Sequence, residues 1–274
     1  MKALCAILFG FFLITNPAHA ADRQKGVDAA SRGDYAAAIA EFRPLAEQGD
    51  AAAQYDLGYM YHEGFGMPQS YPQAFAWIGK SAAQGYVKAQ LNLALMYASG
   101  QGVYKDDTQA AVWFRKAADQ GNAQAQFDLG LSYQNGKGVP KDYAQAFAWY
   151  SKSSAQGDAD GENALGLMYG NGLGVTHDNG RALTLIQQAA AQGNVVALLN
   201  LGSLHEKGLT VPQDTVGALA LYNLAASIDR PRASDAASHR DKLMATMTAQ
   251  QIQSAQALTA EMQKVGVLKA LGAQ

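Results

Sequence analysis

Hydrophobic and small residues recur along the chain with a period of 36 residues. A leucine followed by glycine or alanine marks each period, and the five leucines are Leu57, Leu93, Leu129, Leu165 and Leu201. Tyrosine, alanine and glycine series keep the same step, and no insertion disturbs it between residue 34 and about residue 226. Self-similarity at a fixed period of this length is typical of repeat proteins, whose units stack on their neighbours.

Each period predicts two helices. In residues 158–193, apolar residues at helical spacing predict a helix from about Ala159 to Tyr169 and a second helix that ends near Gln192. Short polar residues able to accept from free helix N–H groups recur at the expected starts. They are Asp34, Ser70, Asp106, Asp142, Asp178 and Asp214 for the second helices, and Asp50, Asn122, Asp158 and Asn194 for the first. Tyr86 is the one exception.

A single helix pair cannot bury both of its faces, so the repeats are expected to stack. The predicted fold is therefore all-α, a right-handed α/α superhelical solenoid of about five 36-residue two-helix repeats plus terminal helices. We expect a degenerate N-terminal repeat at 21–49, five repeats at 50–229, and C-terminal capping helices with a tail at 230–274. Pro231 suits a helix start, and Thr248 with Gln251 forms a capping-box pattern.

Residues 1–20 have the pattern of a secretory signal peptide. Lys2 precedes an apolar stretch that ends at Pro17, and Ala18-His19-Ala20 matches the small-residue cleavage pattern. The alternative is an uncleaved anchor, but the stretch is shorter than the ~20 residues of a membrane helix. We expect cleavage after Ala20 and no membrane span in the mature chain. The expected location is the periplasm, with the extracellular space as the alternative.

The composition disfavours several classes of function. Only 16% of residues are charged and the formal net charge is -2, so no basic surface suited to nucleic acid is expected. The one cysteine, Cys5, lies in the predicted signal segment. Ser-x-x-Lys and Gly-x-Ser-x-Gly patterns are missing from the mature sequence, and the histidines lack metal-binding spacing. We therefore predict a protein that is not an enzyme and binds neither cofactor nor metal.

The repeated segments LGYMYHEGFGM, LALMYASGQGV and LGLSYQNGKGV resemble Sel1-like repeats, which are related to tetratricopeptide repeats. The resemblance covers about residues 22–229. It implies work in protein interaction, as in adaptors, secreted factors and periplasmic regulators. Cysteine-rich secreted members of this family are linked to penicillin binding or hydrolysis, but the mature sequence lacks cysteine. An envelope hydrolase of the β-lactamase kind, or a peptidoglycan-binding protein, remains the alternative.

The outward face of the first helices carries the candidate site. Its apolar positions follow the repeat period, and polar residues flank them, which suits a peptide or helix bound in a groove on the concave surface. The alternative is that neighbouring helices bury this stripe. We expect a partner protein or peptide, such as an envelope sensor or another cell-envelope component. The candidate contacts are Asp56, Tyr59, His62, Glu63, Asn92, Leu95, Asp128, Leu131, Asn135, Leu167, Asn171 and Asn200.

Overall fold

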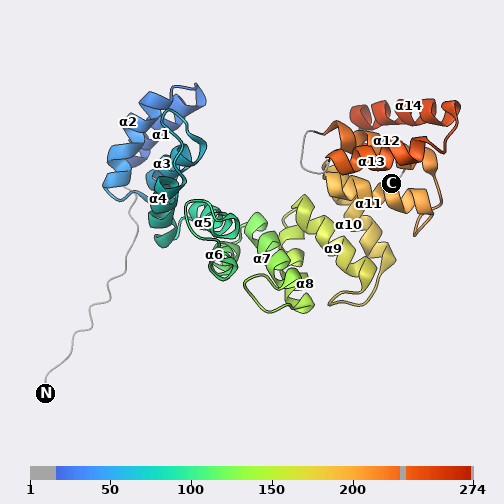
Figure 1. The fold of residues 1–274 in the computed structure, drawn as a ribbon, viewed down its shortest axis with the longest axis horizontal. Helices are drawn as coiled ribbons and strands as arrows, with labels where there is room; N and C mark the ends of the chain where they lie inside the picture. Colours follow the sequence, from blue (N-terminus) through green and yellow to red (C-terminus); the bar gives the residue numbers. More distant parts are fainter. Residues whose placement is uncertain (1–16, 229–232, 273–274) are drawn as a thin grey trace, which may run out of the picture. The chain divides into compact units, whose positions relative to one another are not determined.

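The computed structural model describes residues 17–228 and 233–272, and within these ranges every regular element is a helix. The chain forms two units, Met1–Asp106 and Asp107–Gln274. Figure 1 shows the helix pairs of each unit. The first unit contains α1 (Pro17–Ser31), α2 (Tyr35–Glu47), α3 (Ala51–Glu63), α4 (Tyr71–Ala83) and α5 (Val87–Ser99).

The second unit continues the same alternation and ends in helices outside the repeat period. Its repeat helices are α6 (Asp107–Asp119), α7 (Ala123–Asn135), α8 (Tyr143–Ser154), α9 (Ala159–Asn171), α10 (Asn179–Ala191), α11 (Val195–Lys207) and α12 (Thr215–Ser227). Its terminal helices are α13 (Ala233–Met244), α14 (Ala249–Val265) and α15 (Val267–Ala270). The predicted all-α fold of stacked helix pairs is confirmed, and the right-handed sense of the superhelix stays a prediction.

The helix starts are where the capping residues predict them. Side-chain oxygens accept backbone N–H groups at nine predicted caps, which are Asp34, Asp50, Ser70, Asn122, Asp142, Asp158, Asp178, Asn194 and Asp214. Tyr86 makes no such bond, as expected. Thr248 and Gln251 form the full capping box. Each cap stabilises its helix by about 1 kcal/mol. Pro231 and residues 1–16 lie outside the described residues.

One hydrogen bond closes the inter-helix turn in the same way in each of the five periods from residue 61 onward. The backbone N–H of the residue that precedes each second helix donates to the carbonyl nine positions earlier, at 2.9–3.0 Å. Because this bond recurs at the same spacing, each of these turns closes in the same way. The donor and acceptor pairs are Ser70 and Tyr61, Asp106 and Tyr97, Asp142 and Tyr133, Asp178 and Tyr169, and Asp214 and His205.

Small residues let the two helices of a repeat approach closely. The leucine of the period is fully buried at Leu57, Leu129 and Leu201, and the glycine beside it faces the partner helix. A Cβ added at Gly130 would lie 2.7 Å from the ring of Tyr150, which is too short for two carbon atoms. The glycine is therefore required by packing.

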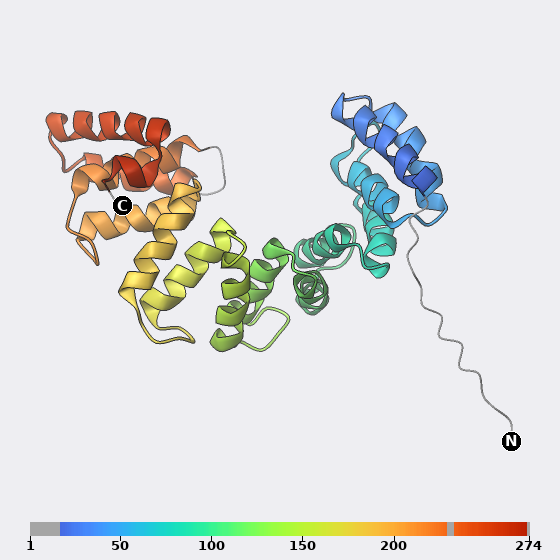
Figure 2. The ribbon, with the colours of Figure 1, turned by 180° about the vertical axis from the view of Figure 1, so that it is seen from behind.

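The C-terminal end of the second unit is covered by the terminal helices. α12 is apolar around its whole circumference, and residues Gly217 to Tyr222 are buried one after another. α13 and α14 pack against it, as both views of the ribbon show (Figure 1, Figure 2). Within the described ranges, no helix combines the length and the apolar character needed to cross a bilayer.

Candidate partner-binding clefts

The predicted apolar stripe on the first helices divides into two rows. Tyr59, Leu95, Leu131 and Leu167 keep between 38% and 42% of their surface exposed, and we call them the outward row. The neighbouring row, which includes Tyr55 and Phe127, is half-buried because its rings pack on Tyr86 and Tyr150. Half of the predicted stripe is thus open to a partner, and the other half belongs to the helix packing.

Five of the candidate residues surround one cleft of the first unit, which we call the α3–α5 cleft. Its volume is about 180 Å³. Apolar side chains from α3, α4 and α5 form much of its lining, and polar side chains complete it. The lining residues are Tyr59, His62, Glu63, Ile78, Asn92, Leu95, Met96 and Gln101. Of these, the sequence analysis missed Ile78, Met96 and Gln101.

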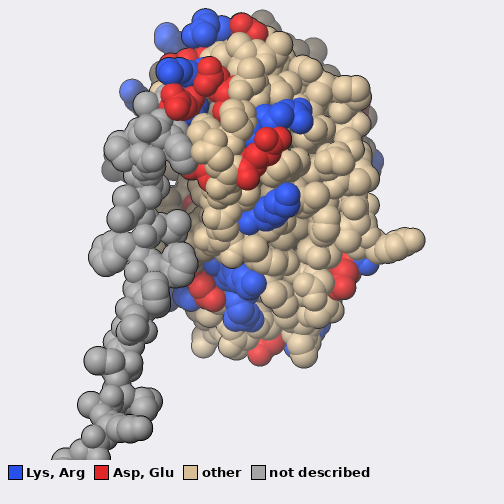
Figure 3. Space-filling view, turned by 90° about the vertical axis from the view of Figure 1, so that its left-hand side faces the viewer, with Lys and Arg blue, Asp and Glu red and all other residues tan. Residues whose placement is uncertain are grey.

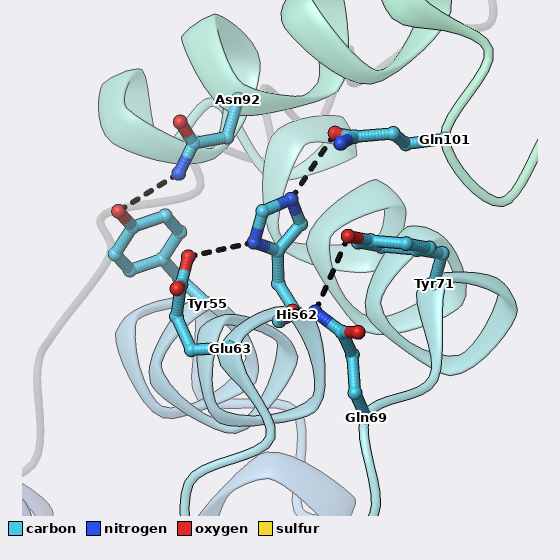
Figure 4. A network of polar contacts seen from close by, with 7 residues as sticks. All are labelled: Tyr55, His62, Glu63, Gln69, Tyr71, Asn92 and Gln101. Carbon is cyan, nitrogen blue, oxygen red and sulfur yellow. Dashed lines mark hydrogen bonds and ion pairs between the residues drawn. The ribbon is translucent and has the colours of Figure 1, made fainter.

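Hydrogen bonds connect the polar side chains around this cleft (Figure 4). His62 Nδ1 lies 2.7 Å from Glu63 Oε1, and His62 Nε2 lies 3.2 Å from Gln101 Oε1. The ring of Tyr71 packs edge-on against the imidazole, with 5.2 Å between the ring centroids. A neutral imidazole donates from one ring nitrogen only, so His62 donates either to Glu63 or to Gln101, and its other nitrogen is an acceptor.

Asn92 is also held in place. Its Nδ2 donates to the hydroxyl of Tyr55 at 2.9 Å, which joins α5 to α3 (Figure 4). Glu63 remains exposed at the mouth of the cleft. The α3–α5 cleft therefore combines an apolar lining with one accessible carboxylate. A segment with an apolar side chain beside a hydrogen-bond donor fits that chemistry.

Three further candidate polar residues, outside the α3–α5 cleft, also make contacts within the protein. Asp56 Oδ2 accepts from Arg23 Nε at 2.6 Å, which joins α3 to α1. Burial raises the pKa of Asp56, and the Arg23 guanidinium opposes that rise. Asn200 Nδ2 donates to Asn163 Oδ1 at 2.9 Å, which joins α11 to α9. These side chains lie between successive first helices and not on a free polar edge.

Asp128 is the third of these residues and the most perturbed electrostatically. Burial on α7 raises the pKa of Asp128 to about 7, and the nearby carboxylates Asp160 and Asp158 add to the rise. Gln124 Nε2 donates to it at 3.4 Å and opposes the shift. From the sequence, this residue was predicted to be a surface contact. The residues of α7 alone do not indicate that the next helix covers it.

The remaining candidates lie in the second unit. Leu131 and Asn135 are exposed on α7. Leu167 and Asn171 line a larger cleft between α9, α10 and α11, which we call the α9–α11 cleft and which has a volume of about 360 Å³. Asn171 Nδ2 donates to the backbone carbonyl of Leu167 at 2.7 Å.

A series of buried amides, which the sequence analysis also missed, joins successive repeats. The Nε2 groups of Gln54, Gln90 and Gln126 each donate to the carbonyl eight residues earlier, at 3.0–3.3 Å. Gln84 and Gln156 then donate to the oxygens of Gln54 and Gln126, both at 2.8 Å. The 36-residue recurrence of these glutamines was a visible signal. Their role is structural, because buried amides need partners.

The surface carries few charged groups, and both signs are mixed. Figure 3 shows this on the face formed by the first unit, where lysines and arginines alternate with acidic residues among uncharged ones. Among the described residues, no group of three or more histidine, cysteine, aspartate or glutamate side chains is placed to hold a metal ion.

The comparisons agree with the repeat pattern. A family model described as Sel1 repeat matches residues 51–86, 87–122, 123–158, 159–194 and 195–228. A Sel1 repeat protein from Oxalobacter formigenes is 33% identical over 75% of this chain and 82% of its own, with a TM-score of 0.71. A protective antigen of uropathogenic Escherichia coli with an SLR fold is 26% identical over 93% of this chain and 70% of its own, with a TM-score of 0.52. No curated protein matches the chain.

Proposed function

The chain belongs to the Sel1 repeat family, and from that premise we propose that it is a scaffold that binds a segment of a partner protein in the α3–α5 cleft. Sel1 repeats are in general scaffolds for protein interaction. The observation that carries the proposal is the convergence of Tyr59, His62, Glu63, Asn92 and Leu95 on one cleft. Residues on two different repeats share this cleft, so only the folded array presents it.

The chemistry of the cleft defines the segment that it accepts. Tyr59 and Leu95 offer exposed apolar surface, and Glu63 offers a carboxylate. A suitable peptide places an apolar side chain on Tyr59 and Leu95, and an N–H or basic group near the carboxylate of Glu63. Each apolar CH₂ group that leaves water contributes about 0.8 kcal/mol. The carboxylate adds orientation more than affinity, because it is exposed to solvent.

We propose further that the protein acts after export, with an envelope protein as its partner. The support is the signal-like pattern of residues 1–20. Mass spectrometry of the exported protein is expected to find Ala21 at its N-terminus. Retention of residues 1–20 would contradict this part of the proposal.

The proposal includes no catalytic step. The Sel1 repeat fold is a non-catalytic scaffold. His62 and Glu63 form a hydrogen-bonded pair, but the residues lining their cleft include no serine, threonine or cysteine that this pair could activate. A pair of this kind is suited to holding a donor group of a ligand. Sustained turnover of a β-lactam or of peptidoglycan fragments by the purified protein would contradict this reading.

A photo-crosslinking residue at position 95 tests where the partner binds, and Leu95→Asp tests whether the cleft is needed. The substitution places an unpaired charge against apolar surface, so we expect at least ten-fold weaker binding of the crosslinked partner. Unfolding should change little because Leu95 is 42% exposed. Binding is measured by calorimetry with the purified partner.

Val112→Asp is the matched control. Val112 is 43% exposed and lies on α6, so the same charge is added at an equally exposed apolar position that does not line the cleft. It should bind like the unmodified protein. If Leu95→Asp stays folded and keeps full affinity, the α3–α5 cleft is not the binding site.

A further inference from the structure

The α9–α11 cleft is the counterpart of the α3–α5 cleft three repeats later in the chain. Six lining positions correspond between the two. The apolar positions stay apolar, whereas His62 and Gln101 correspond to residues without a polar side chain and Glu63 corresponds to an uncharged asparagine. The corresponding pairs are Tyr59 and Leu167, His62 and Gly170, Glu63 and Asn171, Ile78 and Ile186, Met96 and Leu204, and Gln101 and Leu209.

In the α3–α5 cleft, the protein's own side chains occupy much of the space. The imidazole of His62 lies between Gln101 and the ring of Tyr71, and it contacts both (Figure 4). At the corresponding place in the second unit, Gly170 has no side chain and Asn179 replaces the tyrosine ring. The volume rises from about 180 Å³ to about 360 Å³. The larger cleft is open because the residues that would fill it are missing from the sequence.

The turn after α11 is a second reason why the α9–α11 cleft is larger than the α3–α5 cleft. In earlier repeats a glycine with positive φ seats this turn on the start of the preceding second helix, and a Cβ at Gly102 or Gly174 would overlap a backbone carbonyl there. The fifth repeat has Thr210 at this position, with φ of 67°, and among the described residues it is the one non-glycine with positive φ. A residue with a Cβ cannot approach the start of the preceding second helix as closely as Gly102 or Gly174 does, and both Thr210 and Asn179 line the cleft.

The lining of the α9–α11 cleft is uncharged. Leu167, Leu183, Ile186, Leu204 and Leu209 provide its apolar walls, and the other lining residues are glycine, alanine, asparagine and threonine. Leu209 is 52% exposed at the mouth. A charged group that entered would leave water without gaining a partner of opposite charge. The amides of Asn171 and Asn179 offer donors and acceptors at the rim.

We propose that the α9–α11 cleft is an anchor pocket for one uncharged apolar side chain, such as leucine or phenylalanine, of a bound peptide. The volume is within the range of small-ligand sites. The asparagine amides suit the backbone N–H and C=O groups that flank such a side chain in a peptide. The inference rests on the proposed function only in taking the ligand to be a peptide, because the two clefts use different residues.

Methyl-labelled protein titrated with N-acetyl-leucinamide and N-acetyl-phenylalaninamide tests the pocket by NMR. We expect saturable shifts of the methyl groups of Leu183, Ile186 and Leu204, and no such shifts with N-acetyl-lysinamide. Leu95→Asp, which disrupts the α3–α5 cleft, should leave the titration unchanged. Failure of the proposed function and failure of this inference are therefore distinguishable. No saturable shift with either apolar probe would overturn the pocket.

Gly170→Leu is the decisive variant. A Cβ at Gly170 meets only Ala182 Cβ at 3.4 Å, an ordinary contact, and Gly170 lines the cleft, so we expect the leucine side chain to extend into it. We expect at least ten-fold weaker binding of the leucine probe, with a melting temperature no lower than that of the unmodified protein. Leu209→Asp, at the exposed mouth, should weaken binding similarly. If both variants are folded and bind as before, the pocket lies elsewhere.

Discussion

The α3–α5 cleft and the α9–α11 cleft are built on the same backbone frame and offer different chemistry. The first contains a histidine–glutamate pair and is partly filled by its own side chains. The second has glycine and asparagine at those two positions and is larger and uncharged. Changes at a few lining positions and at one turn residue, Thr210, are thus enough to change what a cleft accepts, while the helix pairs around it recur.

The difference shows which residues are free to vary. The positions that change, such as His62 and Gly170, line the clefts, whereas the leucine of each period is buried between helices. The capping residues and the hydrogen bonds that close the turns also lie outside the clefts. Function can therefore vary from repeat to repeat at little cost in stability, because each repeat packs mainly on its neighbours.

The largest expected effect is on the pH dependence of stability. It concerns one repeat position, which is occupied by Asp56 in the first unit and by Asp128 in the second. Asp56 has Arg23 beside it, whereas burial raises the pKa of Asp128 to about 7, well above the ordinary value of 3.8. An acid with a raised pKa in the folded state stays protonated while the unfolded chain ionises. Its contribution to stability is therefore lost as pH rises from about 4 to about 7, by about 4 kcal/mol in all.

Chemical denaturation across pH 4 to 8 measures this loss, and Asp128→Asn is the control. The asparagine cannot ionise, so the variant should lose this part of the pH dependence and be the more stable protein at pH 8. Asp56→Asn should behave differently, because it removes a partner from the partly buried Arg23 and is expected to destabilise at pH 8. Equal pH profiles for the unmodified protein and Asp128→Asn would contradict the assignment.

The next largest expected effect on stability distinguishes a glycine that packs against another side chain, Gly130, from a glycine that faces open space, Gly170. Gly130→Leu would drive a side chain into the ring of Tyr150, and overpacking of this kind costs about 1–3 kcal/mol. Gly170→Leu, also a glycine within a first helix, should instead be neutral or stabilising by about 1 kcal/mol, since glycine is a poor helix former. Urea denaturation monitored by circular dichroism compares them. If both variants lose a similar amount of unfolding free energy, the α9–α11 cleft is not open.

Much of the fold was predictable from the sequence because its determinants are local and repeated. The caps bond within three residues, and a leucine followed by glycine or alanine repeats at every step, so the pattern of one repeat predicts the others. Leu95 and Leu167 were predicted to face outward from helical spacing alone, and they are exposed. Their role in binding stays a prediction.

The chemistry at the candidate site was less predictable because it depends on neighbours from other repeats. Asp56 and Asp128 have the same repeat position, but Arg23 from α1 pairs with Asp56, whereas the carboxylates Asp160 and Asp158 are the charged neighbours of Asp128. The contact between His62 and Gln101 spans 39 residues. A helical pattern indicates which face a residue lies on, but it does not indicate which side chain of the adjacent helix meets it there.

The smallest effect tests how much of the difference between the clefts comes from the turn after α11. Thr210→Gly removes a β-branched residue from a left-handed conformation that costs such residues roughly 1–2 kcal/mol, and about half is offset by the backbone freedom of glycine. We expect a gain of about 0.5–1 kcal/mol in the free energy of unfolding. The turn can then seat on Asn179 as Gly102 seats on Tyr71, which narrows the cleft without filling it. Binding of N-acetyl-leucinamide should weaken about two- to five-fold, less than in Gly170→Leu. A more stable variant with undiminished binding would show that Gly170 alone makes the cleft large.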